Sequence, residues 1–307
     1  MLDPENLYLA QAGALNKDGL RGLPLVIALS HPQDAGATAG HLAEVLLKEL
    51  KNAPIIEFDS DQLHDYRARR PRIRFVEDHY ESPVLPELKL YAVEDRLGKP
   101  FLLLAGAEPD LQWQRFVKSV VNIAEKLEVS VGLLVSGFPM PVPHTRPLPV
   151  SAHGTRKDLT RGISAWNPIA ELPASVSSLL EVSLSEAGIG TAGFAINVPQ
   201  YLSEAELPQS ALLAMEHLSM AAKLSLPTDQ LLDASNSAQL QIAAQVEASP
   251  EIGVMIGRLE ENYDYNIRSG GSQMLSLAER EEGKIPNRDE LGAAIEAYLA
   301  GLTDSDT

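Results

Sequence analysis

The sequence predicts a three-layer α/β/α domain with a mostly parallel, mixed sheet, followed by an acidic helical region. Three observations support this fold class: short, continuously apolar runs, amphipathic segments that alternate with these runs, and the loss of the strand pattern after Pro227. Strands that alternate with helices are typical of a parallel sheet covered by helices on both faces. We therefore assign residues 1–226 to the α/β/α domain and residues 227–307 to a helical C-terminal region.

The first predicted elements are a buried strand, a helix and four further strands. After an N-terminal arm that ends near Pro24, residues 25–30 form an apolar run, as expected of a strand buried on both faces. The turn sequence HPQDAG follows this run, and Leu42, Val45 and Leu46 then recur at helical spacing. Further strands are expected at 54–58, 72–77, 88–93 and 101–106.

The second half of the domain repeats this alternation. Residues 110–127 have the pattern of an amphipathic helix, and residues 131–138 return as a buried strand, which completes a βαβ unit. A proline-rich stretch over 139–149 interrupts regular structure. The remaining elements are a helix over 176–187, a strand over 191–197 and a helix over 207–223.

Two helical stripes are expected beyond Pro227. One consists of Ile252, Met255, Ile256, Leu259 and Tyr263, and the other of Leu291, Ile295, Leu299 and Leu302. From Ser225 to Thr307 the chain carries 15 acidic and 5 basic residues, a net charge of −10 out of −17 for the whole chain. We therefore expect the C-terminal region to be solvated separately from the domain.

The composition excludes several classes of function. A net charge of −17 argues against nucleic acid or an anionic membrane as a partner, because such binding needs basic residues that face phosphates. The absence of cysteine excludes disulfides, thiolate zinc sites and cysteine nucleophiles. We find no metal-ligand spacing and no G-x-S-x-G elbow, so we expect no metal and no cofactor. Apolar runs too short for a bilayer and an acidic start predict a cytoplasmic protein.

Four polar clusters begin directly after predicted strands. They are HPQDAG, AEPD, VPHTRP and NVPQYL, and in a parallel sheet such strand ends converge at one edge, where open α/β sheets bind ligands. The candidate crevice residues are Asp34, Gly36, Glu108, Asp110, His144, Arg146 and Tyr201. Alternatively, Asp34 and Asp110 only cap the helices that follow them, and the proline-rich loops are rigid connectors.

The most unusual string of the chain places His144 and Arg146 between three prolines. Proline restricts the backbone, so the imidazole and the guanidinium would be held ready to bind a carboxylate or a phosphate. The alternative is that Arg146 pairs with Glu108 or Asp110 as a structural lock between neighbouring strand ends. No nucleophile completes the set, so the catalytic residues stay unassigned.

A segment rich in arginine stands out on this acidic protein. Residues 64–74 carry five arginines and one aspartate. Alternating arginines on one strand face would bind an acidic partner or the acidic C-terminal region of another copy. The candidate interaction patch is Asp65, Arg67, Arg69, Arg70, Arg72 and Arg74. The alternative is a solvated, charged edge strand that prevents aggregation.

Three glycines match the dinucleotide-binding pattern G-x-G-x-x-G, namely Gly188, Gly190 and Gly193. In a binding site that pattern follows a strand and opens a helix. Here it closes a predicted helix and enters a strand, so we interpret it as the C-terminal cap of the helix.

In order along the chain, the motifs resemble those of the proteasome assembly chaperone 2 family, in particular its actinobacterial branch. The resemblance spans Leu25 to Leu226 and depends on DAG at Asp34, DYRARRP from Asp65, AEPDLQW from Ala107, VPHTRP and VPQYL. It implies a phosphorylase/hydrolase-like three-layer fold and a tendency to form oligomers. The eukaryotic namesake pairs with a paralogue to help assemble the α ring of the proteasome. Two departures argue against catalysis: no aromatic residue precedes Asp34, and Gln200 stands where relatives often carry a histidine.

Two hypotheses follow. The first is a non-catalytic, oligomeric interaction protein that resembles a proteasome assembly chaperone, with itself as partner, for example in a trimer, and a second protein as a further candidate. The second is a phosphorylase/hydrolase-like or ligase-like enzyme, or a protein that binds a small anion, which would use the crevice at the strand ends.

Overall fold

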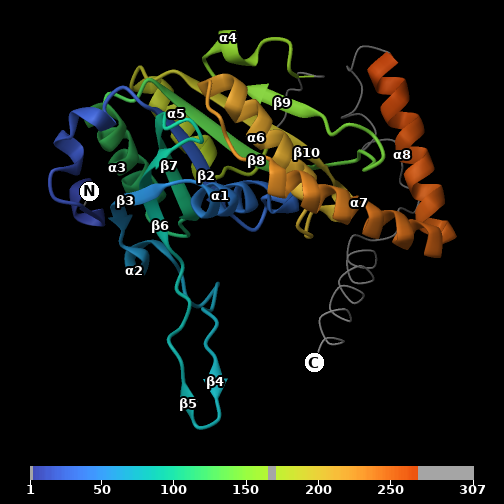
Figure 1. Ribbon diagram of the computed structural model, residues 1–307, viewed down its shortest axis with the longest axis horizontal. Coiled ribbons are helices and arrows are strands. Elements are labelled where there is room, and N and C mark those ends of the chain that lie inside the picture. Colours follow the sequence, from blue (N-terminus) through green and yellow to red (C-terminus); the bar gives the residue numbers. More distant parts are fainter. Residues whose placement is uncertain (1–2, 165–170, 269–307) are drawn as a thin grey trace.

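An eight-stranded mixed sheet runs through the centre of the protein (Figure 1). The computed structural model describes residues 3–164 and 171–268. Along the sheet the strands are β1 (Tyr8–Ala10), β3 (Asn52–Phe58), β6 (Leu88–Glu94), β7 (Pro100–Ala107), β2 (Pro24–Ser30), β8 (Val131–Met140), β10 (Thr191–Pro199) and β9 (Val150–His153).

The four central strands β7, β2, β8 and β10 are parallel, and antiparallel strands flank them on both sides. The parallel strands read as apolar runs because helices cover both of their faces. Their carboxyl ends lie at one edge of the sheet, where the four polar clusters begin. The sequence-based prediction of a mostly parallel mixed sheet is confirmed.

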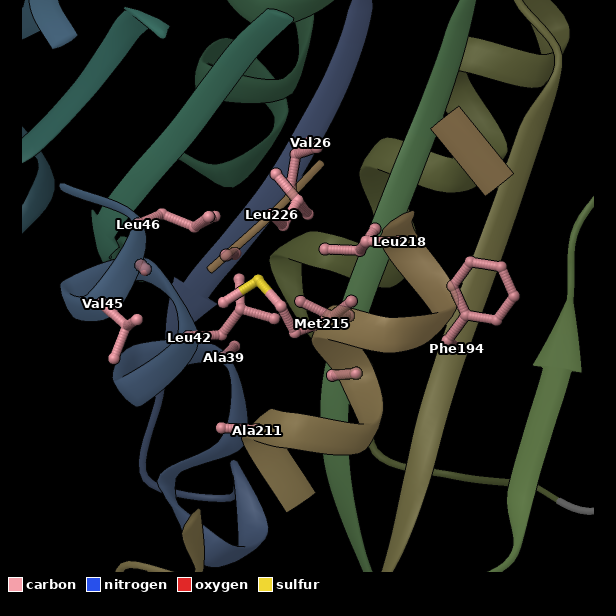
Figure 2. Close-up of a cluster of buried hydrophobic side chains, with 14 of the residues drawn as sticks. Val26, Ala39, Leu42, Val45, Leu46, Phe194, Ala211, Met215, Leu218 and Leu226 are labelled. Carbon is pink, nitrogen blue, oxygen red and sulfur yellow. The ribbon is translucent and has the colours of Figure 1, made fainter. Parts of the chain in front are cut away.

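Two helices cover each face of the sheet, which gives the three layers. Helices α1 (Thr38–Glu49) and α6 (Pro208–Ala222) pack on one face, and α3 (Trp113–Lys126) and α5 (Val176–Glu186) pack on the other. Neighbouring residues of β2 serve opposite layers: Val26 points to the first face and Ile27 to the second, and both are fully buried. Figure 2 shows the first face, where Met215 and Leu218 of α6 approach Leu42 of α1.

Shorter elements complete the domain. They are the helices α2 (Ser60–Leu63) and α4 (Lys157–Thr160), and the 3₁₀ turns Pro4–Leu7, Ala14–Asn16, Asp18–Leu20, Ala35–Ala37 and Gln200–Leu202. No helix in the described part of the chain is long and apolar enough to cross a membrane.

Two helices follow the domain, α7 (Asp229–Ala248) and α8 (Pro250–Arg268). Within residues 227–268 they are not solvated apart from the domain, because Leu231 of α7 is fully buried in the core layer that α6 forms. Tyr263 of α8 is also buried. The predicted stripe from Leu291 to Leu302 lies outside the described residues, and the division at 226/227 stays a prediction.

The predicted strand over 72–77 is wrong. Only Phe75–Val76 is a strand there, β4, and it pairs with β5 (His79–Tyr80) in a separate two-stranded hairpin. The segment from Arg70 to Pro86 projects from the body as a long arm (Figure 1). We call this segment the arm. Alternating charged and apolar residues suggested a sheet edge, but the arm lies outside the main sheet.

Glycine allows one close approach on which the strand-end loops depend. A Cβ atom at Gly137 of β8 would lie 1.8 Å from the carbonyl oxygen of Ala35, in the loop between β2 and α1. Only a residue without a side chain lets this loop lie against β8. The glycine at 188 has φ +83° directly after α5, as expected of a helix C-terminal cap.

We expect Gly137→Ala to lower the free energy of unfolding by more than about 2 kcal/mol, because the added methyl group must displace the backbone of the loop. Urea denaturation followed by circular dichroism measures this change. The matched control is Gly257→Ala in α8, where a Cβ meets nothing within 4 Å and a gain of about 1 kcal/mol is expected. Equal stability of the Gly137→Ala variant and the wild type would contradict the packing described here.

Candidate functional site

The carboxylate of Asp34 joins three backbone segments at the strand-end edge. One oxygen accepts a hydrogen bond from the N–H of Gly137 at 2.8 Å, and the other accepts from Ala39 at 2.8 Å and Gly40 at 3.3 Å. Burial raises the pKa of Asp34, although these N–H donors and His31 oppose the shift. Ala37 occupies the N-cap position of α1, but the bonds from Ala39 and Gly40 confirm that the Asp34 carboxylate caps the first turn of this helix. The bond to Gly137 adds a tie to β8.

Gly36 ties the same loop to the connection between β10 and α6. Its N–H donates to the carbonyl of Ser203 at 2.9 Å, and its carbonyl accepts from Leu207 at 3.0 Å. Its φ of +68° and the approach of Ser210, whose Oγ would lie 3.0 Å from an added Cβ, require glycine here. Gly36 therefore serves as a backbone joint in this arrangement.

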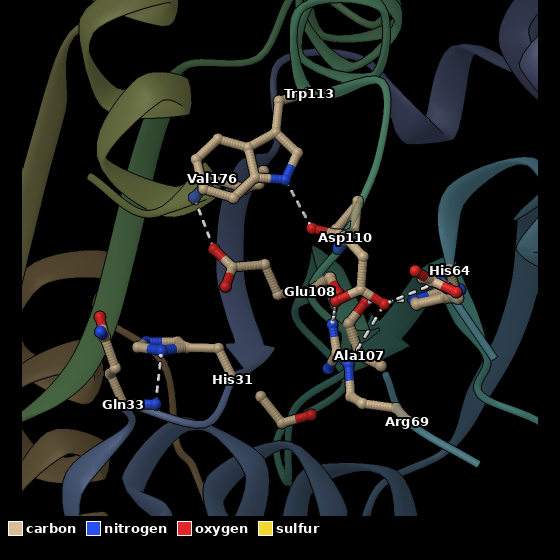
Figure 3. A network of polar contacts seen from close by, with 12 residues as sticks. His31, Gln33, His64, Arg69, Ala107, Glu108, Asp110, Trp113 and Val176 are labelled. Carbon is tan, nitrogen blue, oxygen red and sulfur yellow. Dashed lines mark hydrogen bonds and ion pairs between the residues drawn. The ribbon is translucent and has the colours of Figure 1, made fainter. Parts of the chain in front are cut away.

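Glu108 lies at the end of β7 and contacts the start of α5 (Figure 3). Its Oε1 accepts a hydrogen bond from the N–H of Val176 at 2.5 Å, and only 7% of the residue is exposed. Burial raises the pKa of Glu108, which the hydrogen bond from Val176 and the nearby Arg69 partly offset. The contact places a carboxyl group at a helix N-terminus, where it satisfies an otherwise unpaired donor.

Asp110 and Arg69 form an ion pair beside Glu108 (Figure 3). Arg69 Nε lies 3.2 Å from Asp110 Oδ2, which also accepts from the N–H of Asp65 at 2.9 Å, and Arg69 Nη2 donates to the carbonyl of Glu108 at 2.7 Å. Partial burial opposes ionisation of Asp110, but the bonds from Arg69 and Asp65 outweigh it and hold the pKa of Asp110 below its ordinary value. The capping role proposed for Asp110 is wrong, because its carboxylate accepts bonds from Asp65 and Arg69 and not from the first N–H groups of α3.

The other residues of the predicted interaction patch lie outside this pair. Arg67 pairs with Asp65 at 3.2 Å, and Arg74 pairs with Glu81 at 3.3 Å. Among the described residues no acidic side chain pairs with Arg70 or Arg72. The patch thus divides into one partly buried guanidinium, at Arg69, and exposed arginines before and within the arm, at Arg67, Arg70, Arg72 and Arg74.

His144 and Tyr201 connect the loops after β8 and β10. The hydroxyl oxygen of Tyr201 accepts a bond from the backbone N–H of His144 at 2.9 Å and lies 2.6 Å from its Nδ1. The tautomer of His144 decides which of the two groups donates in the contact between Nδ1 and the hydroxyl. Burial lowers the pKa of His144 and raises that of Tyr201.

Arg146 pairs with α8 and not with the neighbouring strand ends. Its Nε and Nη2 contact the two carboxylate oxygens of Asp264 at 2.9 and 3.0 Å, and its Nη1 lies 3.2 Å from Glu260. The Tyr263 hydroxyl adds a bond of 2.8 Å to the carbonyl of Pro147. The predicted ion pair between Arg146 and Glu108 or Asp110 is therefore wrong, because Arg146 pairs with Glu260 and Asp264 of α8. Binding of a carboxylate or phosphate ligand by His144 and Arg146 stays a prediction. The Arg146 guanidinium already pairs with the carboxylates of Glu260 and Asp264.

Two histidines that the sequence did not single out also lie here (Figure 3). His64 is buried, and its Nε2 lies 3.2 Å from the carbonyl of Ala107, whereas its Nδ1 has no hydrogen-bond partner among the described residues. His31 Nδ1 accepts from the N–H of Gln33 at 3.1 Å, and burial lowers its pKa. The described residues contain no group of three or more histidine and carboxylate side chains placed to hold a metal ion.

These observations define a three-layer α/β/α protein whose strand-end loops are joined by internal polar contacts. The sequence profile of the PAC2 family matches residues 28–246, and the chain belongs to this family. The match continues past residue 226 into α7. A search of the curated proteins gave no match.

Solved structures show the same fold. A Mycobacterium tuberculosis protein of unknown function is 37% identical, with a TM-score of 0.80, over 88% of this chain and 93% of that one. A Corynebacterium glutamicum protein of unknown function is 32% identical, with a TM-score of 0.81, over 85% and 98% of the two chains. A proteasome-assembly chaperone homologue of M. tuberculosis shares the fold at 22% identity and a TM-score of 0.69, over 76% and 100%.

We expect Glu108→Gln to become more stable relative to the wild type as the pH rises. Glutamine keeps the acceptor for Val176 but carries no charge. A carboxyl group whose pKa is raised by folding stabilises the native state below its unfolded pKa, and this contribution is lost as the pH rises through the folded pKa. Urea midpoints between about pH 4 and about pH 8 measure the difference. Parallel pH profiles of the two proteins would contradict the burial of an ionisable carboxyl here, and the exposed Glu125→Gln is the control.

Proposed function

We propose that this member of the PAC2 family is a non-catalytic, oligomeric interaction protein that assists the assembly of other proteins, in the manner of a proteasome-assembly chaperone. One observation carries the proposal: the polar side chains at the strand ends are engaged by internal partners. Asp34 binds three backbone donors, Asp110 binds Arg69, and Arg146 binds α8. An active site would need some of these groups directed at a substrate.

The exposed arm is a second observation that supports this proposal. It presents large apolar side chains to solvent, which soluble monomers rarely gather in one place unless the patch contacts another molecule. The M. tuberculosis neighbour described as a proteasome-assembly chaperone homologue shares this fold and motivates the choice of an assembly role. The proposal includes a cytoplasmic location, a homo-oligomer such as a trimer, and a second protein as partner.

The test is to identify the proteins that bind this chain in its native cell. After crosslinking and affinity purification, we expect a second protein at a fixed molar ratio to this chain, measured by native mass spectrometry. Two outcomes would contradict the proposal. One is the recovery of this chain alone. The other is a thermal shift with phosphate, nucleotides or amino acids that Arg146→Ala abolishes and Arg161→Ala retains, since that result would favour an anion-binding site.

A further inference from the structure

We propose that the end of β8 and the loop after it form a docking surface for an acidic amphipathic helix of a partner protein, and that α8 covers this surface in the free chain as a reversible latch. We call residues 138–147 the seat. The inference rests on the proposed interaction function and deepens it, because it names the kind of partner and the contact that controls its access.

α8 is attached to the surface of the domain and not through its core. It stands at one end of the molecule (Figure 1). Among the described residues, the two large core clusters contain no side chain of α8, whereas Leu231 of α7 is fully buried in one of them. Tyr263 of α8 joins a small, separate cluster with Met140 and Val142 of the seat. Release of α8 would therefore leave both core layers intact.

The polar contacts between α8 and the seat are open to water. Arg146 pairs with Glu260 and Asp264, and the hydroxyl of Thr145 donates a hydrogen bond to Glu260. The side chains of Arg146, Glu260 and Asp264 are 32%, 30% and 37% exposed. Ion pairs that water screens to this extent add little to stability. Exchange of these carboxylates for those of another molecule therefore costs little free energy.

α8 also has a low intrinsic stability. Gly253 and Gly257 lie inside the helix, and a Cβ atom added at either would meet nothing within 4 Å, so packing does not require glycine there. Glycine in a helix interior is destabilising relative to alanine. Ser249 has an extended backbone, with φ −131° and ψ 100°, and Pro250 has no N–H with which to continue the hydrogen bonds of α7. α8 is therefore a separate unit that is able to open about Ser249.

Opening of α8 would expose a surface with the chemistry of an interface. Val142 is fully buried and Met140 is 8% exposed in their cluster with Tyr263, and Phe138 packs against this cluster. The same movement would free the guanidinium of Arg146 from both carboxylates. Apolar side chains around one arginine are typical of the centre of a protein interface.

The contacts of α8 specify the partner. Glu260, Tyr263 and Asp264 share one side of the helix, since they are three and four residues apart. An amphipathic helix that carries an aromatic residue and two acidic residues at this spacing would make the same contacts, in the manner of a helix bound in a groove. Because α8 and the partner helix compete for one surface, the open fraction of the chain sets the apparent affinity of the partner.

The first experiment measures the binding of a fluorescent synthetic peptide of residues 250–268 to the purified full chain by fluorescence anisotropy. In the wild type α8 occupies the seat. We therefore expect the peptide to bind at least about tenfold more tightly to the double variant Tyr263→Ala, Asp264→Ala, which keeps the seat intact. The matched control, Val254→Ala with Glu261→Ala, changes two exposed residues of the same helix and should bind the peptide as weakly as the wild type.

A charge reversal shows that the peptide binds at the seat. Adding Arg146→Glu to the double variant should abolish binding of the peptide. A second peptide, with Glu260→Lys and Asp264→Lys, should restore it. This rescue excludes misfolding of the variant as the cause of the loss.

Amide hydrogen exchange of the wild-type chain measures the opening of the latch. We expect the amides of α8 to exchange at least about tenfold faster than those in the middle of β2, because α8 opens while the sheet stays folded. Gly257→Ala should slow the exchange of α8 about fivefold, because alanine stabilises the helix.

A photo-crosslinker in place of Thr145 identifies the natural occupant of the seat. In native cells we expect crosslinks to a helical segment of a partner protein with the acidic and aromatic spacing of α8. Their yield should be higher with the double variant than with wild-type α8, and the peptide of residues 250–268 should compete with them in a lysate.

Several results would overturn the inference. They are equal affinity of the wild type and the double variant for the peptide, no binding by either, binding that ignores Arg146→Glu, amides of α8 as protected as those of β2, and crosslinks to a segment without this spacing. Recovery of a stoichiometric partner protein in spite of such a result would leave the assembly role standing, so the two failures are distinguishable.

Discussion

The buried carboxylate of Asp34 is the interaction on which the strand-end edge depends. It holds the start of α1 and the end of β8 through three backbone N–H groups, at a point where Gly137 lets the two segments come into contact. A carboxylate removed from water is stable only when its lone pairs are filled, and here the backbone fills them. These bonds hold the loop between β2 and α1 against β8, and the connection between β10 and α6 packs against this loop.

The remaining polar residues join the other strand-end loops to neighbouring elements. Glu108 joins β7 to α5, the Arg69–Asp110 pair joins the base of the arm to β7, and Tyr201 joins the loops after β8 and β10. Arg146 then binds α8 to the outermost of these loops. Each candidate crevice residue connects two elements of the fold.

The sequence predicted what depends on local pattern. The four central strands were recognisable because both of their faces are buried, and the convergence of their polar clusters followed from their parallel direction. β1 and β9 were missed, since edge strands of three and four residues carry no periodicity. The partner of Arg146 lies 118 residues away in Asp264, so it depends on how α8 packs. The alternation over 72–77 was misread because an arm and an edge strand share the same pattern of charged and apolar residues.

Amide hydrogen exchange tests most directly whether the strand-end edge is closed around Asp34. We predict that the N–H groups of Ala39 and Gly137 exchange only through global unfolding, with the same opening free energy as the amides in the middle of β2 and β8. Exchange of these two amides many times faster than that of the β2 and β8 amides, under conditions where the sheet stays protected, would show that the edge opens on its own. That result would contradict a strand-end edge closed around Asp34 and would favour a binding site formed by the strand-end residues.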